Sequence, residues 1–438
     1  MTSKDTGCFV YITLPGQTSA VTAGKYQLVH SATWDLKGEF IYGRRYMERK
    51  DAVPLDPVEL GTLAGKVFST ARSNGLFGSL RDACPDSWGR RLIEKRLGLP
   101  GVERPEIDYM LNSPDDRAGA IGFGLGLQPP APIRRFNRTL NLRRLMEMAD
   151  QITASEDDPA GAVRPADDDE RADIEQTDHL IRAGTSMGGA RPKATVEDRR
   201  ALWVAKFPLA KDRWNNPRVE HAMMQLAQSC GISSAETRIV SVAGRDVLLV
   251  KRFDREAVEG GFARIRMISG LTLLGIEEED RTQWSYLRMA EEIQRRATAD
   301  HAGHLAELFR RMTFNALISN TDDHPRNHAF LGHGGSWDLS PAYDLTPTPS
   351  VSQSRRLAME CGASGRDATR ENLLSECVRF RLHPEAAEKI VDNMTAAVNT
   401  GWYQAVRAAG VTEADAGKIQ NAFVCEGFGA KEDDAFCP

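Results

Sequence analysis

The stretch SNTDDHPRNHAFL, from Ser319 to Leu331, decides the interpretation of this sequence. It places Asp322 and Asn327 in a short loop between the amphipathic segment ELFRRMTFNALI and an apolar, strand-like segment. Pro325 holds this loop out of helical geometry. Asp344 follows in SPAYDLTP, just beyond the apolar strand and a proline turn. The order is therefore a carboxylate, an amide and a second carboxylate.

These residue types suit phosphoryl transfer, in which the protein mainly orients the attacking hydroxyl and holds Mg²⁺ against phosphates. A D-x-x-x-x-N loop followed by an aspartate has the order and approximate spacing that protein kinases use. We assign Asp322 as the base and Asn327 and Asp344 as Mg²⁺ ligands. The alternative is that these residues only cap and close turns. His324 is a catalytic group, a metal ligand, or a side chain packed within the loop.

A small-residue loop, GTSMGGARPKATV (Gly184 to Val196), is a candidate for binding the phosphates of ATP through its backbone. It fits neither the Walker A nor the G-x-G-x-x-G pattern, so a glycine turn without a ligand remains the alternative. The residues expected near phosphate are Gly188, Gly189, Ala190, Arg191, Pro192 and Lys193.

Two further segments complete a candidate nucleotide pocket. Lys206 is the charged residue in the apolar run ALWVAKFPL, where a kinase has the strand lysine that pairs with ATP phosphates. A lysine extending from a strand edge is the alternative. Glu220, which opens the next helix, is its possible partner or a helix-capping residue. In VLLVKRFDRE, the backbone of Lys251, Arg252 and Phe253 would meet adenine, as a hinge does.

Length and composition limit the class of protein. The chain has 438 residues, 41% hydrophobic and 27% charged, with a formal net charge of −5. This mild acidity argues against a surface that grips nucleic acid throughout. Seven scattered cysteines without C-x-x-C spacing indicate reduced thiols. Because there is neither a signal-like leader nor a long apolar run, we expect a soluble, cytoplasmic protein with no membrane partner.

The hydropathy pattern predicts an α+β protein. Residues 8–47 alternate as in an antiparallel sheet, and the pattern becomes helical from Pro57, through VELGTLAGKVF and DSWGRRLIEKRLG. The runs ALWVAKF and RDVLLVKRFD indicate strands, and beyond Arg266 the pattern is mainly helical, with short strands near 329–339. An acidic stretch, 151–178, is a poor core former. We expect an N-terminal α+β subdomain, a helical or acidic linker, the ATP-binding elements and a helical C-terminal lobe, at 1–130, 131–180, 181–258 and 259–438. This organisation corresponds to a two-lobed, protein-kinase-like core with a β-rich N-terminal subdomain.

Together these segments resemble the HipA family, the serine/threonine kinase toxins of bacterial toxin–antitoxin pairs. The family's N-x-D-x-H-x-K-N signature is matched by Asn320, Asp322, His324 and Asn327, and its PAYD-type segment by Pro341 to Asp344. Its S-x-x-G-A-x-x-K loop is matched by Ser186, Gly189, Ala190 and Lys193, and its hinge by Lys251–Arg255. The resemblance also places His324, Arg326 and Tyr343 beside ATP.

The resemblance implies an ATP- and Mg²⁺-dependent protein kinase whose substrate is a translation component such as an aminoacyl-tRNA synthetase. It implies a helix-turn-helix antitoxin as partner, with operator DNA reached mainly through that antitoxin. It also implies autophosphorylation at Ser186, with Thr185 as the second choice, which would expel the phosphate loop.

The sequence departs from the family pattern at Arg326, where lysine is usual, and at Asp323, where a small residue is common. Asp323 would either recruit a second Mg²⁺ or weaken ATP binding. Three other functions remain open: a catalytically weak kinase-like binding protein in a repressor complex, a small-molecule phosphotransferase, and a metal-dependent hydrolase using Asp322, Asp323 and His324.

Overall fold

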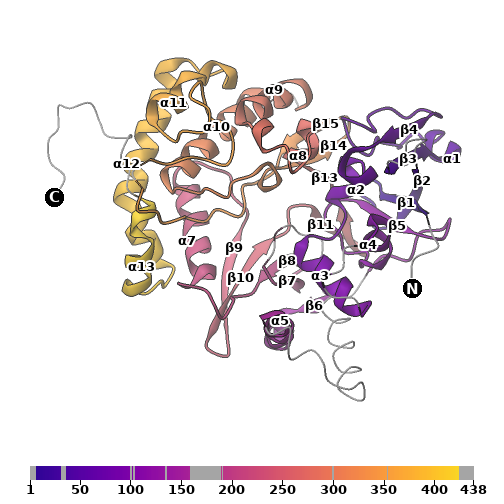
Figure 1. Ribbon diagram of the computed structural model, residues 1–438, viewed down its shortest axis with the longest axis horizontal. Coiled ribbons are helices and arrows are strands. Elements are labelled where there is room, and N and C mark those ends of the chain that lie inside the picture. The colour runs from indigo at the N-terminus through magenta and orange to yellow at the C-terminus, as the bar shows by residue number, and fades with distance from the viewer. Residues whose placement is uncertain are drawn as a thin grey trace. The chain divides into compact units, whose positions relative to one another are not determined.

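The computed structural model describes residues 6–30, 36–98, 101, 104–133, 136–157, 189, 191–297, 300–352 and 354–423 (Figure 1). The chain divides into two compact units. The first unit comprises 1–211, 240–268 and 331–335, and the second comprises 212–239, 269–330 and 336–438. The first unit thus contains both the predicted N-terminal subdomain and most of the predicted ATP-binding elements. The boundaries expected at residues 130, 180 and 258 stay predictions.

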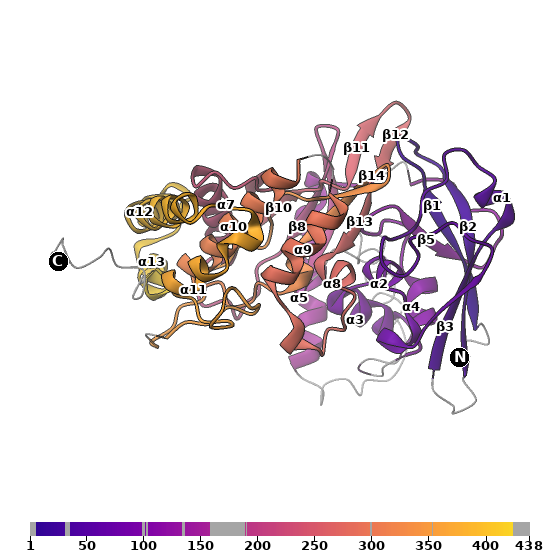
Figure 2. The same ribbon diagram turned by 90° about the horizontal axis from the view of Figure 1, so that it is seen from above.

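The first unit begins with an antiparallel sheet, as its alternating sequence predicts (Figure 2). The sheet has five strands in the order β4-β3-β2-β1-β5. The strands are β1 (Gly7–Thr13), β2 (Ala20–His30), β3 (Leu36–Tyr42), β4 (Val67–Thr70) and β5 (Ile121–Gly124). Alternate side chains such as Val10, Ile12 and Phe40 point into one buried apolar core with Phe77 and Leu80.

Short helices accompany this sheet. They are α1 (Arg44–Met47), η1 (Arg72–Gly75), α2 (Gly78–Asp82), α3 (Ser87–Arg96) and α4 (Glu106–Asn112). The predicted helix within DSWGRRLIEKRLG is confirmed as α3, and it begins there because the Asp86 carboxylate accepts a hydrogen bond from the Gly89 amide at 2.8 Å.

The predicted helix over VELGTLAGKVF is wrong. Residues 58–66 form bends and β4 begins at Val67. The buried Asp56 carboxylate accepts hydrogen bonds from the amides of Val58, Glu59 and Leu60 at 2.8, 2.7 and 3.0 Å. A side chain that takes successive amides in this way competes with helical hydrogen bonding, and two glycines in the segment weaken the helix further.

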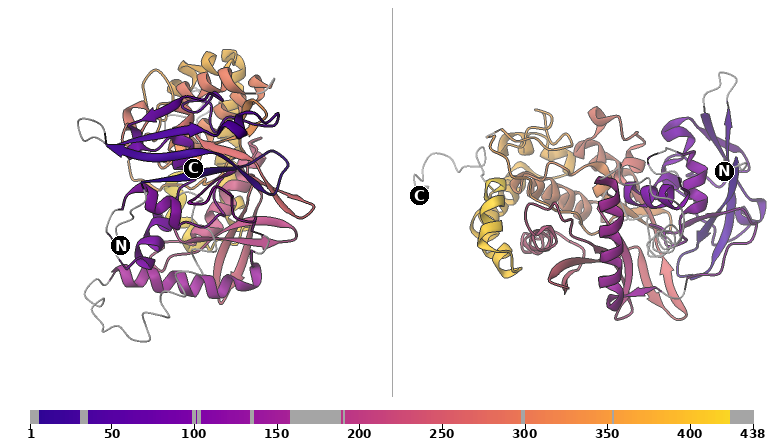
Figure 3. Two further views of the ribbon diagram at one scale, coloured as in Figure 1. Left: turned by 90° about the vertical axis from the view of Figure 1, so that its right-hand side faces the viewer. Right: turned by 60° about the horizontal axis from the view of Figure 1, so that its bottom comes forward.

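A second five-stranded sheet in the first unit has the order β6-β7-β8-β10-β9. Its strands are β6 (Asn137–Arg138), β7 (Lys193–Asp198), β8 (Ala201–Lys206), β10 (Arg245–Lys251) and β9 (Thr237–Val242). The helical segment η2 (Thr139–Asn141) leads into α5 (Leu142–Asp157), which lies against the sheet (Figure 3). The apolar runs read as strands at β8 and β10 are confirmed.

The second unit is mainly helical, as predicted for the C-terminal part. Its longer helices are α7 (Asn216–Ser229), α9 (Tyr286–Arg296), α10 (His301–Leu317) and α12 (Pro384–Ala408). Its shorter helical segments are α8 (Gly270–Leu274), η4 (Arg281–Gln283), η5 (Pro325–Asn327), α11 (Arg370–Ser375), η6 (Cys377–Phe380), α13 (Glu413–Ile419) and η7 (Gln420–Ala422). Helix α12 packs along α7 and also contacts α10 (Figure 1).

Two small sheets complete the strands of the described residues. One pairs β11 (Arg255–Val258) with β12 (Gly261–Arg264). The other has the order β13-β14-β15, with strands Arg266–Ser269, Ala329–His333 and Ser336–Leu339. The strands expected near 329–339 are thus confirmed. In the described part of the chain, every helix is too short or too polar to span a membrane.

Candidate active site

The predicted catalytic loop begins where α10 ends. Ser319 adopts a left-handed φ of 52°, and the amide of Asn320 still bonds the carbonyl of Asn315 at 2.8 Å. The chain then turns tightly, since the His324 amide donates to the Asp322 carbonyl at 2.9 Å. Pro325 starts the single turn η5, where its missing N–H costs no hydrogen bond. The end of α10, the turn at Asp322 and Pro325 therefore hold the loop in this conformation without the help of a ligand.

Asp322 and Asn327 lie on this loop and differ in how far they are exposed to solvent. Asp322 is exposed, whereas Asn327 is buried. The Asn327 amide nitrogen Nδ2 donates to the main-chain carbonyl of Asp322 at 2.9 Å. Because the nitrogen is engaged in this bond, the amide oxygen is the atom that Asn327 can offer to a cation.

Asp344 lies on a segment that is fixed to the same unit by backbone hydrogen bonds. Ala342 forms a parallel bridge with Ser234, with the Ala342 amide 2.7 Å from the Ser233 carbonyl. Asp344 itself has a φ of 61°, a conformation that costs energy for most side chains and is best tolerated by Asn and Asp. Strained backbone of this kind occurs preferentially at functional sites.

The two segments meet, because the Tyr343 hydroxyl donates to the carbonyl of Arg326 at 2.8 Å. Although the Asp322 side chain is exposed to solvent, partial desolvation of its carboxylate raises the pKa of Asp322 above its ordinary value. The negative charges of Asp344 and Asp323 add to this rise against the opposing effect of His324. The bond between Tyr343 and Arg326 thus ties the segment of Asp344 to the loop of Asp322, and the direction of the pKa shift agrees with this proximity. A raised carboxylate pKa is what a general base needs to accept a proton near neutral pH.

The donor set fits a magnesium ion. Asp322, Asp344 and Asn327 offer carboxylate and amide oxygens, which Mg²⁺ prefers, and the mutual repulsion of the carboxylates is what a cation would relieve. Among the described residues no three His, Cys, Asp or Glu side chains gather as a metal-binding group. The expected set includes an asparagine and keeps Mg²⁺ waters, so it differs from an all-protein metal cage.

Asp323 is not placed for the first role expected for it, recruitment of a second Mg²⁺, and its effect on ATP binding stays a prediction. Its side chain is buried and contacts the Tyr286 hydroxyl and the His328 imidazole, the latter at 2.9 Å. It therefore faces away from the exposed Asp322 and is not placed to recruit a second Mg²⁺ at the loop surface. The hydrolase hypothesis, which needed Asp322, Asp323 and His324 as one ligand group, loses its support for the same reason.

Arg326 and His324 lie within the loop, and each contacts a residue outside it. A guanidinium nitrogen of Arg326 lies 3.1 Å from the carboxylate of Glu278, which is exposed. The His324 ring packs edge-on against Trp284, with ring centroids 6.1 Å apart. Glu278 could not be predicted, because nothing in the acidic run 277–280 indicates which residue pairs with the loop.

The first unit holds Lys206 and the last part of the small-residue loop Gly184 to Val196, called the glycine loop below. Lys206 ends β8, directly opposite Lys193 on β7 and Leu248 on β10. The Lys193 ammonium is buried, 2.7 Å from the Asp86 carboxylate and 3.0 Å from the Gly189 carbonyl. Asp86, the N-terminal cap of α3, thus also anchors the strand that follows the glycine loop.

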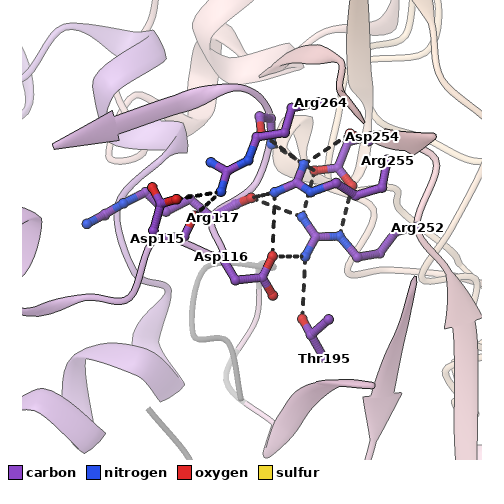
Figure 4. A network of polar contacts seen from close by, with 9 residues as sticks. Asp115, Asp116, Arg117, Thr195, Arg252, Asp254, Arg255 and Arg264 are labelled. Atoms are coloured by element: carbon purple, nitrogen blue, oxygen red, sulfur yellow. Dashed lines mark hydrogen bonds and ion pairs between the residues drawn. The ribbon is translucent and has the colours of Figure 1, made fainter. Parts of the chain in front are cut away.

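The predicted hinge is held by a buried network of charges (Figure 4). Arg252 donates to Asp116 at 2.7 Å and to both carboxylate oxygens of Asp254, at 2.9 and 2.8 Å. Arg255 contacts Asp254 at 2.7 Å, and Arg264 contacts Asp115 at 2.8 Å. The Arg252 side chain is therefore used for structure, and its main-chain N–H donates to the Leu202 carbonyl at 2.9 Å. The contact with adenine predicted for the backbone of Lys251–Phe253 stays a prediction.

The roles predicted for several other residues stay predictions. Arg191 and Pro192 lead into β7, and Pro192 is buried. Lys206 lies in the first unit and Glu220 in α7 of the second, so their pairing is untested. Thr185, Ser186, Gly188 and Ala190 lie outside the described residues, as does most of the acidic segment 151–178.

A β-rich unit with a strand lysine, followed by a helical unit with a D-x-x-x-x-N loop and a later aspartate, defines an α+β fold of the two-lobed, protein-kinase-like class. Residues 185–402 match the HipA-like C-terminal domain. The chain also matches a chain of the solved complex of HipA, HipB and operator DNA from Shewanella oneidensis MR-1, with a TM-score of 0.65. That match is 17% identical and covers 95% of this chain and 94% of the other. The chain therefore belongs to the HipA family.

Curated relatives agree with this assignment. A Haemophilus influenzae protein named "Putative kinase" is 28% identical over 155 residues, which are 32% of this chain and 44% of the relative. "Putative kinase Y4dM" of Sinorhizobium fredii is 27% identical over 246 residues, 50% of this chain and 56% of the relative. The chain thus spans only about half the length of these relatives.

Proposed function

We propose that this chain is an ATP- and Mg²⁺-dependent serine/threonine protein kinase that acts as the toxin of a toxin–antitoxin pair. The observation that carries the proposal is the loop of the second unit. The exposed Asp322 lies beside Asn327, whose amide nitrogen donates to the Asp322 carbonyl, and the Tyr343 hydroxyl ties the segment of Asp344 to the same loop. The raised pKa of Asp322 agrees with this arrangement. An exposed base beside two oxygen donors is the arrangement that phosphoryl transfer requires.

In the proposed reaction the Asp322 carboxylate orients a substrate hydroxyl and accepts its proton as the oxygen attacks the γ-phosphorus of ATP. The bond from that phosphorus to the bridging oxygen breaks, and ADP leaves. Mg²⁺ would supply charge neutralisation on the phosphates, with Asn327 and Asp344 as its protein ligands. Lys206 and the backbone near Gly189 would contact the phosphates, and the backbone of Lys251–Phe253 would contact the base.

The proposal extends to Ser186 as the autophosphorylation site, with Thr185 second, and to a translation component such as an aminoacyl-tRNA synthetase as substrate. A phosphate on Ser186 would be repelled from the position of the ATP phosphates. We further propose a helix-turn-helix antitoxin as partner, through which the chain reaches operator DNA. The solved HipA–HipB–DNA complex from Shewanella oneidensis supports this part by fold similarity.

The test is phosphoproteomics after induced expression of the wild type and of Asp322→Asn, together with the intact mass of the purified chain after incubation with Mg-ATP. We expect the wild type to gain the mass of a phosphoryl group and to phosphorylate a cellular protein, and the variant to do neither. A wild type that gains no mass and labels no protein overturns the kinase proposal. If the same chain also lacks Mg²⁺-dependent ATP affinity in calorimetry, a non-catalytic role in a repressor complex is favoured.

A further inference from the structure

Asp323 is a buried carboxylate directly behind the proposed base. Its exposed fraction is 2%, although it follows the exposed Asp322 in the chain. Burying a carboxylate is costly unless hydrogen bonds and charges compensate it. Since apolar residues of similar size would fill the space at no such cost, the carboxylate calls for an explanation other than packing.

A chain of hydrogen bonds leads from the backbone of Asp322 to the side chain of Asp323. The Asp322 amide donates to Asn320 Oδ1 at 3.4 Å, and Asn320 Nδ2 donates to Asn315 Oδ1 at 3.0 Å. Asn315 Nδ2 then donates to the Tyr286 hydroxyl oxygen at 3.2 Å, and that hydroxyl donates to Asp323 Oδ2. The bonds therefore form a ring that closes on two consecutive residues, one of them the proposed base.

A second donor reaches the same oxygen, because Nε2 of the His328 imidazole lies 2.9 Å from Asp323 Oδ2. A carboxylate only accepts hydrogen bonds, so the phenol and the imidazole are both donors. His328 follows Asn327 and is buried, with its ring edge-on to Tyr286 at 5.6 Å between centroids. Asp323 is thus bonded to the residue after Asn327 as well as to α9.

All donors in the ring point in one direction, so that each bond polarises the next. The side chains of Asn315, Asn320, Tyr286 and Asp323 are all buried, where a misaligned donor would be left unpaired. Burial first, and Asp323 second, raise the pKa of Tyr286 well above its ordinary value, so the phenol keeps the proton that it donates. The ring has one satisfied arrangement, and this arrangement fixes the backbone on both sides of the Asp322 side chain.

We propose that Tyr286, Asp323 and His328 are positioning residues that hold Asp322 and Asn327 in the geometry needed for phosphoryl transfer. This inference rests on the proposed function. The residues act through the loop backbone and touch neither substrate nor metal. Removing them should therefore lower kcat while leaving KM for ATP close to the wild-type value, because a small misplacement of a base slows chemistry more than binding.

The experiment compares Tyr286→Phe, Asp323→Asn and the double variant with the wild type. Tyr286→Phe removes one buried oxygen and keeps the ring packing, so it tests the idea even if Asp323→Asn folds poorly. Tyr46→Phe is the matched control, since it deletes a buried hydroxyl bonded to the Val53 carbonyl at 2.7 Å in the first unit. For each variant kcat, KM for ATP, melting temperature and hydrogen exchange of a peptide covering 319–331 are measured.

We expect each ring variant to lose about tenfold to a hundredfold in kcat, with KM for ATP changed less than about threefold, and the double variant to lose little more than either single variant. Exchange of the 319–331 peptide should become faster in the ring variants and stay unchanged in Tyr46→Phe. Wild-type kcat in Tyr286→Phe, or independent and multiplying losses in the double variant, would overturn the inference.

The exchange measurement separates this inference from the proposed function. If the wild type transfers no phosphoryl group, the kinase proposal fails, and so does a positioning role for these residues in that reaction. This holds even if the hydrogen-exchange data show that the ring orders the loop. An active wild type whose Tyr286→Phe variant exchanges and turns over normally leaves the kinase proposal standing and removes this inference alone.

Discussion

The guanidinium of Arg252 lies 2.7 Å from the carboxylate of Asp116, although 136 residues separate them in the chain. Both side chains are almost fully buried. Arg252 also bonds the Arg117 carbonyl at 2.9 Å. The segment predicted to meet adenine is therefore held by residues from the N-terminal part of the same unit, and those residues are part of the scaffold of the candidate nucleotide site (Figure 4).

Breaking this pair from one side should destabilise the first unit strongly. Asp116→Asn leaves two guanidinium groups, of Arg252 and Arg255, with less negative charge in a buried environment, and one-sided loss of a buried ion pair typically costs about 3–5 kcal/mol. The free energy of unfolding in urea measures the effect. Glu48→Gln, which breaks the exposed pair of Arg44 and Glu48, is the control and should change little. Equal urea midpoints for the two variants would contradict the structural role of the network.

The pair of Asp86 and Lys193 permits a similar test next to the glycine loop. Asn caps helices as well as Asp does, so Asp86→Asn keeps the cap of α3 through Oδ1. It replaces the charged Oδ2 that accepts from the buried Lys193 ammonium with an uncharged NH2 group that cannot accept a hydrogen bond. The expected loss is again about 3–5 kcal/mol. Asp86→Asn combined with Lys193→Met should recover much of it, because no buried charge is then left unpaired. The free energy of unfolding in urea is measured for the wild type, Asp86→Asn, Lys193→Met and the double variant. If the loss of stability in the double variant equals the sum of the two single losses, the two side chains are not paired.

Local sequence patterns predicted much of the fold and the catalytic loop. They could not predict ion pairs between residues that are far apart in the chain. Alternation identified β1 to β3, and the ordered Asp322, Asn327 and Asp344 identified the candidate site. The pairs joining Asp86 to Lys193 and Asp116 to Arg252 span 107 and 136 residues, and no spacing rule selects such partners. The helix wrongly predicted after Pro57 failed because the Asp56 side chain captures amides that a helix would need.

Asp344→Asn should weaken Mg²⁺ dependence without distorting the backbone. Asn tolerates the left-handed φ of 61° as well as Asp does, whereas Ala would add strain of about 1–2 kcal/mol. Loss of one carboxylate ligand should raise the Mg²⁺ concentration for half-maximal activity at least about tenfold, or about 1.4 kcal/mol. Asp338→Asn, which removes a carboxylate beside His304, is the control and should leave this concentration unchanged. Identical Mg²⁺ titrations for wild type and Asp344→Asn would exclude Asp344 as a ligand.

The proposed base should impair stability while it serves activity. Partial burial and the nearby Asp344 and Asp323 raise the pKa of Asp322, so the folded state holds the Asp322 proton more tightly than the unfolded chain does. A carboxyl group with a raised folded pKa destabilises the fold as pH rises from its ordinary value through the raised value. Without Mg²⁺ at neutral pH, Asp322→Asn should therefore melt at a higher temperature than the wild type, while its kcat falls about 10²–10⁴-fold.

The pH dependence identifies the cause of this difference. As pH falls through the raised pKa of Asp322 toward the ordinary aspartate pKa of 3.8, the wild-type carboxyl becomes protonated, and the stability advantage of Asp322→Asn should vanish. Thermal melts of both proteins across this range measure the difference directly. The Asp338 carboxylate lies 3.3 Å from His304 Nε2, so Asp338→Asn should not gain stability at neutral pH, because it removes the charged partner of that imidazole. An advantage of Asp322→Asn that persisted unchanged at low pH would mean that the Asp322 charge is not its source, and would remove the electrostatic argument for Asp322 as the base.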